Sequence, residues 1–309
     1  VDCAALPSLI RPYTNIEVNN TDMPVDLLAA IDNIPNAETV VYNQIVFLPN
    51  QKRELALLDK KKNRHASIPN PSNQMAVEDI KRVQEKFTAA PIRCKKAGYD
   101  GVELHGAHSY LIAQFFSKYY NRRTDAYGGS LENRCRFNLE VIREMRKNMP
   151  EDMPLLMRLD AIDEMLPAVT TVDETVEFIG WAQEAGLDAI DLSRGNARSL
   201  ATVYEVPPYN LEPGFNMDNI AAIKARVNIP VIGVGRIVDP ALADQLIREG
   251  KIDMVAVGRA QLADPEWCNK SMEGREAEIR RCIGCTEGCY DKVIDPKAKP
   301  IACPRNPGL

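Results

Sequence analysis

Four cysteines near the end of the chain form the pattern with the plainest chemical meaning. Cys282, Cys285, Cys289 and Cys303 are separated by two, three and thirteen residues, whereas the other four cysteines are scattered. A chain of 309 residues can bury a large core without a disulfide framework, so a metal or cluster site is favoured. Structural zinc more often uses paired Cys-x-x-Cys knuckles, and four thiolates also suit a cubane iron–sulfur cluster. The spacing therefore favours the cluster and leaves zinc as the alternative.

Two of the three histidines lie in one short segment, which runs from His105 through His108 to Tyr110. The segment follows an apolar run that we expect to be a strand, and barrel active sites are built where strands end. A metal site is a weak interpretation, because no carboxylate lies nearby in register. The structural alternative is a hydrogen-bonded pair of polar core residues.

Two later apolar runs each end in glycine followed by arginine, at Gly235-Arg236 and at Gly258-Arg259. In β/α barrels the loops after the last two strands often bind phosphate, because glycine lets backbone N–H groups approach and arginine neutralises charge. The alternative is a pair of tight turns that carry solvent-facing arginines. Two consecutive endings of this kind favour phosphate binding.

The elements that must position these residues follow a repeating unit. Residues 97–104 match residues 185–192 nearly position for position, and residues 249–257 are a looser third copy. Each copy predicts a helix that ends at glycine, then a tight turn and a short apolar strand. Further strands are expected around 155–159 and 230–234.

Helix signals separate these strands. Residues 171–174 read Thr-Val-Asp-Glu, which is a capping box, and Asp239 precedes Pro240 at the first position of another predicted helix. Apolar residues at helical spacing predict an amphipathic helix over 77–97. Pro91 lies inside that helix and is expected to kink or break it.

Alternating strands and helices with short loops predict an α/β fold with a parallel sheet. The second half of the chain supplies five such units, which suits the later units of a (β/α)8 TIM barrel. Residues 1–75 are expected to form an atypical or incomplete N-terminal barrel segment, with a strand within 39–48. Residues 76–273 are expected to form the barrel, and residues 274–309 a cysteine-bearing segment that follows it.

Two long motifs carry a family resemblance. From residue 101 the chain reads Gly-Val-Glu-Leu-His-Gly-Ala-His-Ser-Tyr-Leu-Ile-Ala-Gln-Phe-Phe, and residues 119–134 read Tyr-Tyr-Asn-Arg-Arg-Thr-Asp-Ala-Tyr-Gly-Gly-Ser-Leu-Glu-Asn-Arg. Both closely resemble the old yellow enzyme family of flavin barrels. With the cysteine-rich end, the chain is similar to the iron–sulfur branch that includes 2,4-dienoyl-CoA reductase, enoate reductases and trimethylamine dehydrogenase. The resemblance covers roughly residues 75–309, and the family's opening strands are not recognisable in residues 1–75.

The resemblance implies a cofactor, FMN, and residues that hold it. Gly235, Arg236, Gly258 and Arg259 would lie at its phosphate. Arg158 matches the family's arginine beside the flavin N1–C2 carbonyl, where a cation would stabilise the anionic reduced flavin. The four clustered cysteines would hold a [4Fe–4S] cluster. The segment 121–134 is expected to be structural, with Arg134 among the residues that pin a loop to the following helix.

The resemblance also implies catalytic roles. His105 and His108 would hydrogen-bond a substrate carbonyl and so polarise a conjugated alkene. Tyr110 matches the family's proton donor, and a phenol is a suitable acid because the carbanion-like carbon is far more basic than phenolate.

The leading functional hypothesis is a reductase of activated C=C bonds in a small molecule with a conjugated carbonyl. NAD(P)H would supply the electrons through the cluster to FMN. A cluster implies a second redox site, which the family places in a C-terminal region that binds FAD and NAD(P)H. The Gly-x-Gly-x-x-Gly fingerprint of that region does not occur here. Another domain or subunit would therefore supply the second redox site. The alternatives are an amine dehydrogenase and a non-catalytic electron-transfer subunit. Amine oxidation is weakened because the trimethylamine dehydrogenase pattern has tyrosine at His105 and an acidic residue at Asn196.

The charge and composition of the chain limit the classes of partner that it is expected to bind. A net charge of −5 and a charged fraction of 26% give no support to binding of nucleic acid or of a membrane surface. The sequence has no apolar run long enough to span a membrane and no secretory signal, so a cytoplasmic protein is expected. Formation of a homo-oligomer is left open.

Overall fold

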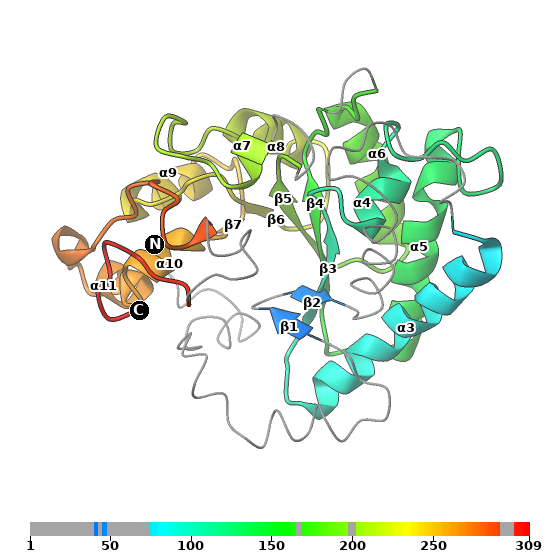
Figure 1. Cartoon of the computed structure of the whole chain (residues 1–309), viewed down its shortest axis with the longest axis horizontal. Helices are drawn as coiled ribbons and strands as arrows, with labels where there is room; N and C mark the ends of the chain where they lie inside the picture. Colours follow the sequence, from blue (N-terminus) through cyan, green and yellow to red (C-terminus); the bar gives the residue numbers. More distant parts are fainter. Residues whose placement is uncertain (1–39, 43–44, 48–74, 165–167, 197–201, 291–299) are drawn as a thin grey trace.

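The structure is a computed structural model. It describes residues 40–42, 45–47, 75–164, 168–196, 202–290 and 300–309. Five parallel strands pair in chain order to form its central sheet (Figure 1). These strands are β3 (Val102–Gly106), β4 (Leu155–Asp160), β5 (Ala189–Ser193), β6 (Val231–Gly233) and β7 (Met254–Val255).

Helices connect the strands, as parallel pairing requires. In Figure 1, the long helices α3 and α5 lie side by side along the outer side of the strands. The helices in chain order are α3 (Val77–Lys96), α4 (Leu111–Phe116), α5 (Leu131–Asn148), α6 (Val172–Glu184), α7 (Thr202–Glu205), α8 (Met217–Lys224), α9 (Pro240–Arg248), α10 (Arg259–Ala263), α11 (Trp267–Met272) and the 3-10 turn η4 (Glu276–Glu278). The predicted α/β class, with a strand–helix alternation in its second half, is therefore confirmed.

The predicted repeat is confirmed in its turns as well as in its strands. Gly98, Gly186 and Gly250 have φ angles of +86°, +105° and +69°. All three lie just after a helix and a few residues before a strand. Residues with a Cβ atom rarely adopt this left-handed conformation, so glycine is required where each chain segment reverses into the sheet.

The predicted helix starts are also observed. Thr171 and Glu174 form both hydrogen bonds of the capping box at the start of α6. The Asp239 carboxylate accepts the backbone N–H of Ala241 at 3.1 Å at the start of α9.

Of the two effects expected of Pro91, a kink or a break, the break does not occur, because α3 continues from Val77 to Lys96 with Pro91 inside it. A proline inside a helix removes one backbone hydrogen bond. Burial of Pro91 together with Ile80, Val83 and Phe87 offsets this cost, because all of them belong to the buried face of the helix.

The strand expected within residues 39–48 is two strands. β1 (Val40–Tyr42) and β2 (Ile45–Phe47) pair antiparallel, with Val40 opposite Phe47. The other expectations for residues 1–75 fall outside the described residues.

The sheet has one apolar and one polar face. Side chains of a strand alternate between faces. On β4, Met157 and Leu159 are at most 1% exposed and belong to the apolar core, as do Leu104, Ile190 and Leu192 on the neighbouring strands. The alternate positions carry charged and polar side chains, and these build the site described below.

No helix in the described part of the chain is long and apolar enough to cross a membrane.

Arg134 pins the loop that precedes α5, as expected from the motif. Its guanidinium donates to the carbonyl oxygens of Phe116 and Gly129 at 3.0 and 2.9 Å. The remaining nitrogen donates to Glu174 at 2.9 Å, so α5 is also tied to the start of α6. The Arg134 side chain is only 5% exposed, and these bonds replace its lost hydration.

We expect Arg134→Met to lower the free energy of unfolding by about 3 kcal/mol, because it leaves the Phe116 and Gly129 carbonyls without this donor and removes one of the two cations that pair with Glu174. Urea unfolding measures this change. Arg143→Met is the matched control, since Arg143 lies exposed on the same helix; its effect should stay within about 0.5 kcal/mol. Equal effects of the two substitutions would contradict the anchoring role.

Candidate active site and cysteine cluster

Three neighbouring strands bring ionisable side chains into one row across the polar face of the sheet. His105 on β3 pairs in register with Arg158 on β4, and Arg158 pairs with Asp191 on β5. One step further along, Asp160 pairs with Ser193. Because the strands are parallel, these side chains gather near the carboxyl end of the sheet, where β/α proteins place their sites.

Arg158 is the central cation of this face. Its guanidinium donates to Asp191 at 2.6 Å and to the Ser193 hydroxyl at 3.1 Å. Burial raises the pKa of Glu103 to about 8, and the nearby Asp191 carboxylate adds to the rise while Arg158 opposes it. The Arg158 guanidinium therefore faces three carboxyl groups, Asp191, Glu103 and Asp160, and burial raises the pKa of each of them.

Both histidines of the predicted site are neutral. Burial lowers the pKa of His105 to about 3, and the positive charge of Arg158 adds to the shift. The pKa of His108 is likewise held well below its ordinary value by burial, by Arg158 and by His105. A neutral imidazole keeps one N–H donor and one acceptor, so each ring can donate a single hydrogen bond to a ligand.

His108 is fixed by its neighbours. Its Nε2 atom shares a hydrogen bond of 2.7 Å with the Ser193 hydroxyl. Its backbone N–H donates to the Asp160 carboxylate at 2.7 Å. On the other side of the ring, Nδ1 lies 3.7 Å from an oxygen of Glu205.

The backbone around His108 is strained. His108 and Ser109 have φ angles of +57° and +63°, a conformation that costs about 1–3 kcal/mol for residues other than glycine. The hydrogen bond to Asp160 holds this conformation from one side. From the other side, the Gln114 side chain donates to the Ser109 carbonyl at 2.6 Å.

Tyr110 completes the predicted group. Its ring centroid lies 4.6 Å from that of His105, and the two histidine rings are 5.5 Å apart. Burial raises the pKa of Tyr110, and the charges of Glu205 and Tyr290 raise it further, so the phenol is protonated. The structure thus brings together all three residues that the sequence placed in one site.

Sequence reasoning missed four residues of this site, for two different reasons. Asp160, Asp191 and Ser193 could have been found, because they alternate with apolar residues on two predicted strands. Glu205 could not, because it lies on the short helix α7 in the connection between β5 and α8. Its side chain is 14% exposed, and burial raises its pKa to about 7.

The two arginines predicted to bind phosphate both reach the connection between β5 and α8. Arg236 donates through Nη1 to the carbonyl oxygens of Tyr209 and Leu211. Arg259 donates through Nη2 to the carbonyl of Pro207 at 2.7 Å. Each keeps one buried nitrogen, Nε of Arg236 and Nη1 of Arg259, without a hydrogen-bond partner among the described residues.

The glycines before these arginines differ in surroundings. A Cβ atom on Gly258, at the N-terminal end of α10, would meet no described atom within 4 Å. At Gly235 it would lie 3.5 Å from Asn216. Unpartnered guanidinium nitrogens together with open space at a glycine fit an anionic group, because buried N–H donors need acceptors.

The four cysteines line one small cavity beside Arg259. None of the described cysteines forms a disulfide. Burial raises the pKa of Cys289, Arg259 opposes the rise, and the neighbouring Cys282 and Cys285 add to it, so these sulfur atoms lie near one another.

Cys303 reaches this cavity through a close backbone contact. The Ala302 N–H donates to the Gly288 carbonyl at 2.7 Å. Gly288 has a φ of +78°, and a Cβ atom there would lie 2.5 Å from the Ala302 carbonyl oxygen. Only glycine allows this approach, which carries Cys303 back to the other three cysteines.

By residue type, the four cysteines could hold a zinc ion or an iron–sulfur cluster. Among the described residues, no three His, Cys, Asp or Glu side chains converge in a way that could hold one metal ion. A zinc ion draws its ligands within about 2.3 Å, whereas each thiolate of an iron–sulfur cluster binds its own iron. Four thiols around one cavity are a donor set that an iron–sulfur cluster can use.

A family model matches residues 42–278, which is most of the chain, and describes the NADH:flavin oxidoreductase / NADH oxidase family. The chain belongs to this family. Its expected kinship with flavin barrels of the old yellow enzyme type is thereby confirmed.

Three characterised relatives differ in what their names describe. An NADH oxidase of Thermoanaerobacter brockii is 44% identical over 76% of the chain and 35% of the relative. A cinnamate reductase of Clostridium sporogenes is 33% identical over 79% of the chain and 38% of the relative. A dimethylamine dehydrogenase of a Hyphomicrobium species is 35% identical over 69% of the chain and 29% of the relative. The matched part of the chain therefore spans between 29% and 38% of the length of these relatives.

A solved structure supports the same fold. A complex of 2-naphthoyl-CoA reductase with 2-naphthoyl-CoA superposes with a TM-score of 0.70 at 31% sequence identity. The match covers 76% of this chain and 35% of that protein.

We expect Glu205→Gln to change the pH dependence of stability. Between pH values of about 4.5 and about 7, folded Glu205 keeps a proton that the unfolded chain has released. This group therefore makes the free energy of unfolding fall as pH rises through that interval. The glutamine variant lacks this loss, so its stability relative to the parent should rise across that interval and level off above it. Urea unfolding at a series of pH values measures the difference.

The exposed Glu212, in the same connection, is the control for this experiment. Glu212→Gln should give a difference that varies little with pH. A flat difference for Glu205→Gln as well would mean that the Glu205 carboxyl is hydrated and not buried beside His108.

Proposed function

We propose that this chain is the flavin-binding part of an oxidoreductase that reduces an activated C=C bond conjugated to a carbonyl group. The observation that carries the proposal is the convergence of two neutral histidines and a protonated tyrosine at one end of the sheet, beside the buried Arg158. Similarity to a cinnamate reductase and to 2-naphthoyl-CoA reductase supports this substrate class.

FMN is the cofactor that the family implies. Gly235, Arg236, Gly258 and Arg259 would hold its phosphate, and the unpartnered nitrogens of the two arginines support this assignment. Arg158 would lie at the N1–C2 carbonyl edge of the flavin, where its charge favours the reduced anionic form. When bound, FMN supplies the hydride that the protein's own groups cannot.

The protein residues would then act on the substrate. His105 and His108 would donate hydrogen bonds to its carbonyl oxygen and so draw electron density away from the alkene. Ser193 and Asp160 would hold His108 in place, since they bond to its ring and to its backbone. Tyr110, protonated and next to His105, would give a proton to the carbon that becomes basic.

The four cysteines would hold a [4Fe–4S] cluster that passes electrons to the flavin. NAD(P)H would be the source of these electrons. Arg259 lines the cysteine cavity, and Tyr290, next to Cys289, lies close enough to influence Tyr110. The cluster would thus sit beside the active site. Residues 76–273 would form the flavin barrel and 274–309 the cluster segment, in a reducing compartment such as the cytoplasm.

A C-terminal FAD domain or a separate subunit would deliver the electrons. The greater length of the relatives supports this partner, because each has room for further domains.

Amine oxidation is the second candidate. Glu205 favours it, because this carboxyl group lies beside His108 and Tyr110 and could bind a cationic amine. The similarity to dimethylamine dehydrogenase agrees with this alternative.

An anaerobic spectrum of the purified chain tests cofactors and reaction together. We expect flavin bands and broad iron–sulfur absorbance, with reoxidation of the dithionite-reduced protein by cinnamate. Bleaching of the oxidised protein by dimethylamine would favour the amine reaction instead, and absence of flavin would leave a non-catalytic subunit.

Cys285→Ser should remove most of the iron, whereas Cys94→Ser, on helix α3, should retain it. Equal iron in both variants would contradict the cluster assignment.

We expect Tyr110→Phe to slow alkene reduction by about 10²–10⁴-fold, the usual contribution of a general acid, while flavin content and reduction stay unchanged. Stopped-flow mixing of the reduced protein with cinnamate measures the rate. Tyr99→Phe is the control, because Tyr99 precedes β3 at the opposite end of the strand. Equal loss in both half-reactions would exclude the role of proton donor.

A further inference from the structure

The Glu205 carboxyl group at the active site has one oxygen atom without a hydrogen-bond partner among the described residues. This atom, Oε2, is buried. The other oxygen, Oε1, lies 3.7 Å from Nδ1 of His108, which is longer than a hydrogen bond. Buried polar atoms are nearly always satisfied, so the carboxyl group of Glu205 is placed to contact a bound molecule.

Contacts of the neighbouring Tyr204 hold helix α7, and with it Glu205, in place. The Arg194 guanidinium lies over the Tyr204 ring, 4.0 Å from its centroid. The Phe215 ring stacks with that of Tyr204 at a centroid distance of 5.8 Å. Arg194 also donates two hydrogen bonds to Glu164, at 2.9 and 2.7 Å. A guanidinium that is both stacked and paired through its planar fork fixes its partners in one geometry.

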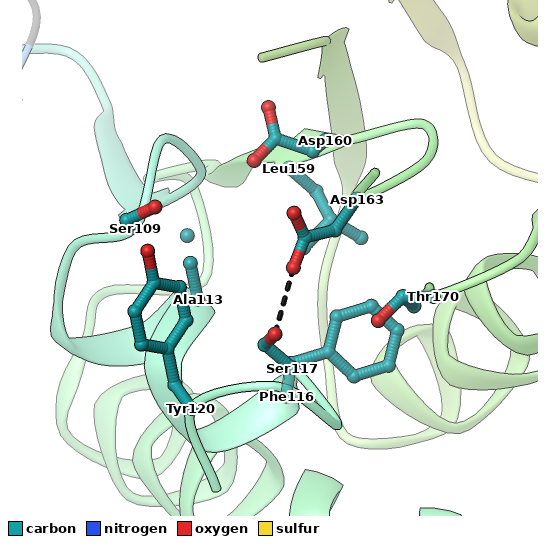
Figure 2. A pocket seen from close by; sticks show the side chains of 10 residues that line it. Ser109, Ala113, Phe116, Ser117, Tyr120, Leu159, Asp160, Asp163 and Thr170 are labelled. Carbon is teal, nitrogen blue, oxygen red and sulfur yellow. Dashed lines mark hydrogen bonds between the residues drawn. The ribbon is translucent and has the colours of Figure 1, made fainter. Parts of the chain in front are cut away.

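The chain after β4, which carries Glu164, is anchored in turn. Figure 2 shows the Asp163 side chain turned toward Ser117 at the end of α4, whose hydroxyl donates to it at 2.7 Å. The backbone groups of Asp163 and Thr170 exchange two hydrogen bonds, of 3.1 and 2.9 Å. The support of α7 therefore continues from Arg194 into the body of the fold.

The hydrogen bonds of Ser193 determine which ring nitrogen of His108 carries the proton. The Ser193 hydroxyl oxygen accepts from Arg158 at 3.1 Å, so its own proton is left to donate to Nε2 of His108, 2.7 Å away. In the neutral ring the remaining proton then lies on Nδ1, the atom that faces Glu205. A carbonyl oxygen that accepts this N–H would therefore lie next to the Glu205 carboxyl group.

Two arginines that border this position are already paired. Arg158 donates to Asp191 at 2.6 Å, and Arg194 donates to Glu164. Both histidines of the site are neutral. A carboxylate bound beside them would meet hydrogen-bond donors but neither of these paired cations, and it would lie next to a second acid, Glu205. Burial of a charge without a counter-charge is costly.

We propose that Glu205 selects the substrate by charge, so that the site prefers an uncharged acyl compound, such as a thioester, ester or ketone, to a free carboxylate. This inference rests on the proposed reduction of an activated alkene and names its substrate class. Ionised Glu205 would repel a carboxylate that accepts from His108, whereas an uncharged carbonyl group avoids this repulsion. Glu205 would thus determine specificity, and Tyr110 would remain the proton donor.

The preference should strengthen as pH rises. Burial raises the pKa of Glu205 to about 7, and Arg158 opposes the rise. The other titratable groups that interact with Glu205 are His108, Tyr110 and Asp160. The pKa of His108 lies well below its ordinary value and that of Tyr110 above it, so neither group changes charge near pH 7. Burial raises the pKa of Asp160 as well, so a variant must separate Asp160 from Glu205.

A comparison of cinnamate with methyl cinnamate tests the proposal, because the two compounds share the alkene and differ in charge. Stopped-flow mixing measures reoxidation of the dithionite-reduced, FMN-loaded chain by each compound at pH values from about 6 to about 8.5. Calorimetric titration measures equilibrium binding of each compound to the oxidised protein. We expect the ester to be preferred by at least about tenfold at the highest pH, in rate and in affinity, and by less where Glu205 is protonated.

Two variants assign the preference to its residue. Glu205→Gln should remove the pH dependence of the preference, because the amide is uncharged throughout. Glu212→Gln is the matched control, since Glu212 lies exposed in the same connection, and it should retain that dependence. A parent protein without the preference would overturn the proposal. An unchanged pH dependence in Glu205→Gln would overturn it too and would point to Asp160.

The two readouts separate this inference from the proposed reaction. Selective binding of the ester without reoxidation would refute alkene reduction and leave the selection by Glu205 in place. Equal reoxidation by both compounds at every pH would support alkene reduction and overturn the selection. Binding of neither compound would overturn both.

Discussion

The buried guanidinium of Arg158 is the interaction on which the rest of the site depends. It lies on the middle one of three parallel strands, bonds to Asp191 and Ser193, and is the positive charge that opposes proton binding by both histidines. Removing a charge from water is costly unless it is paired, so Arg158 and Asp191 require each other. The neutral state of His105 follows from burial next to this cation. A protonated imidazole there would add a second buried positive charge.

The site also depends on short stretches of constrained backbone. His108 and Ser109 hold a left-handed conformation that Asp160 and Gln114 stabilise through hydrogen bonds. At the other end of the site, Gly288 permits a backbone contact with Ala302 that returns Cys303 to the cysteine cavity. In both places a rigid sheet or a paired backbone supports the strained residues. Functional side chains are therefore held where an unsupported loop would not keep them.

Much of this architecture could be predicted from local patterns. The repeated glycine turns, the capping box and the alternation of strands and helices each reflect a local conformational preference. These features could therefore be predicted without knowledge of any tertiary contact. Whether Pro91 breaks its helix could not be predicted locally, because that depends on what the helix buries, and the buried face of α3 offsets the lost hydrogen bond. The sequence could not distinguish one strand from two within 39–48, because a short hairpin and a single strand share the same apolar pattern.

The sequence by itself determined the family and the α/β class, and it identified the two histidines, the tyrosine and the four cysteines as one set of chemical groups. Residue type and short spacing sufficed, because these groups lie within short segments. The tertiary structure alone decided that Glu205 stands beside His108 and that Arg236 and Arg259 reach the same connection. These contacts join residues many positions apart, and strand register with helix packing brings them together, which no local pattern encodes.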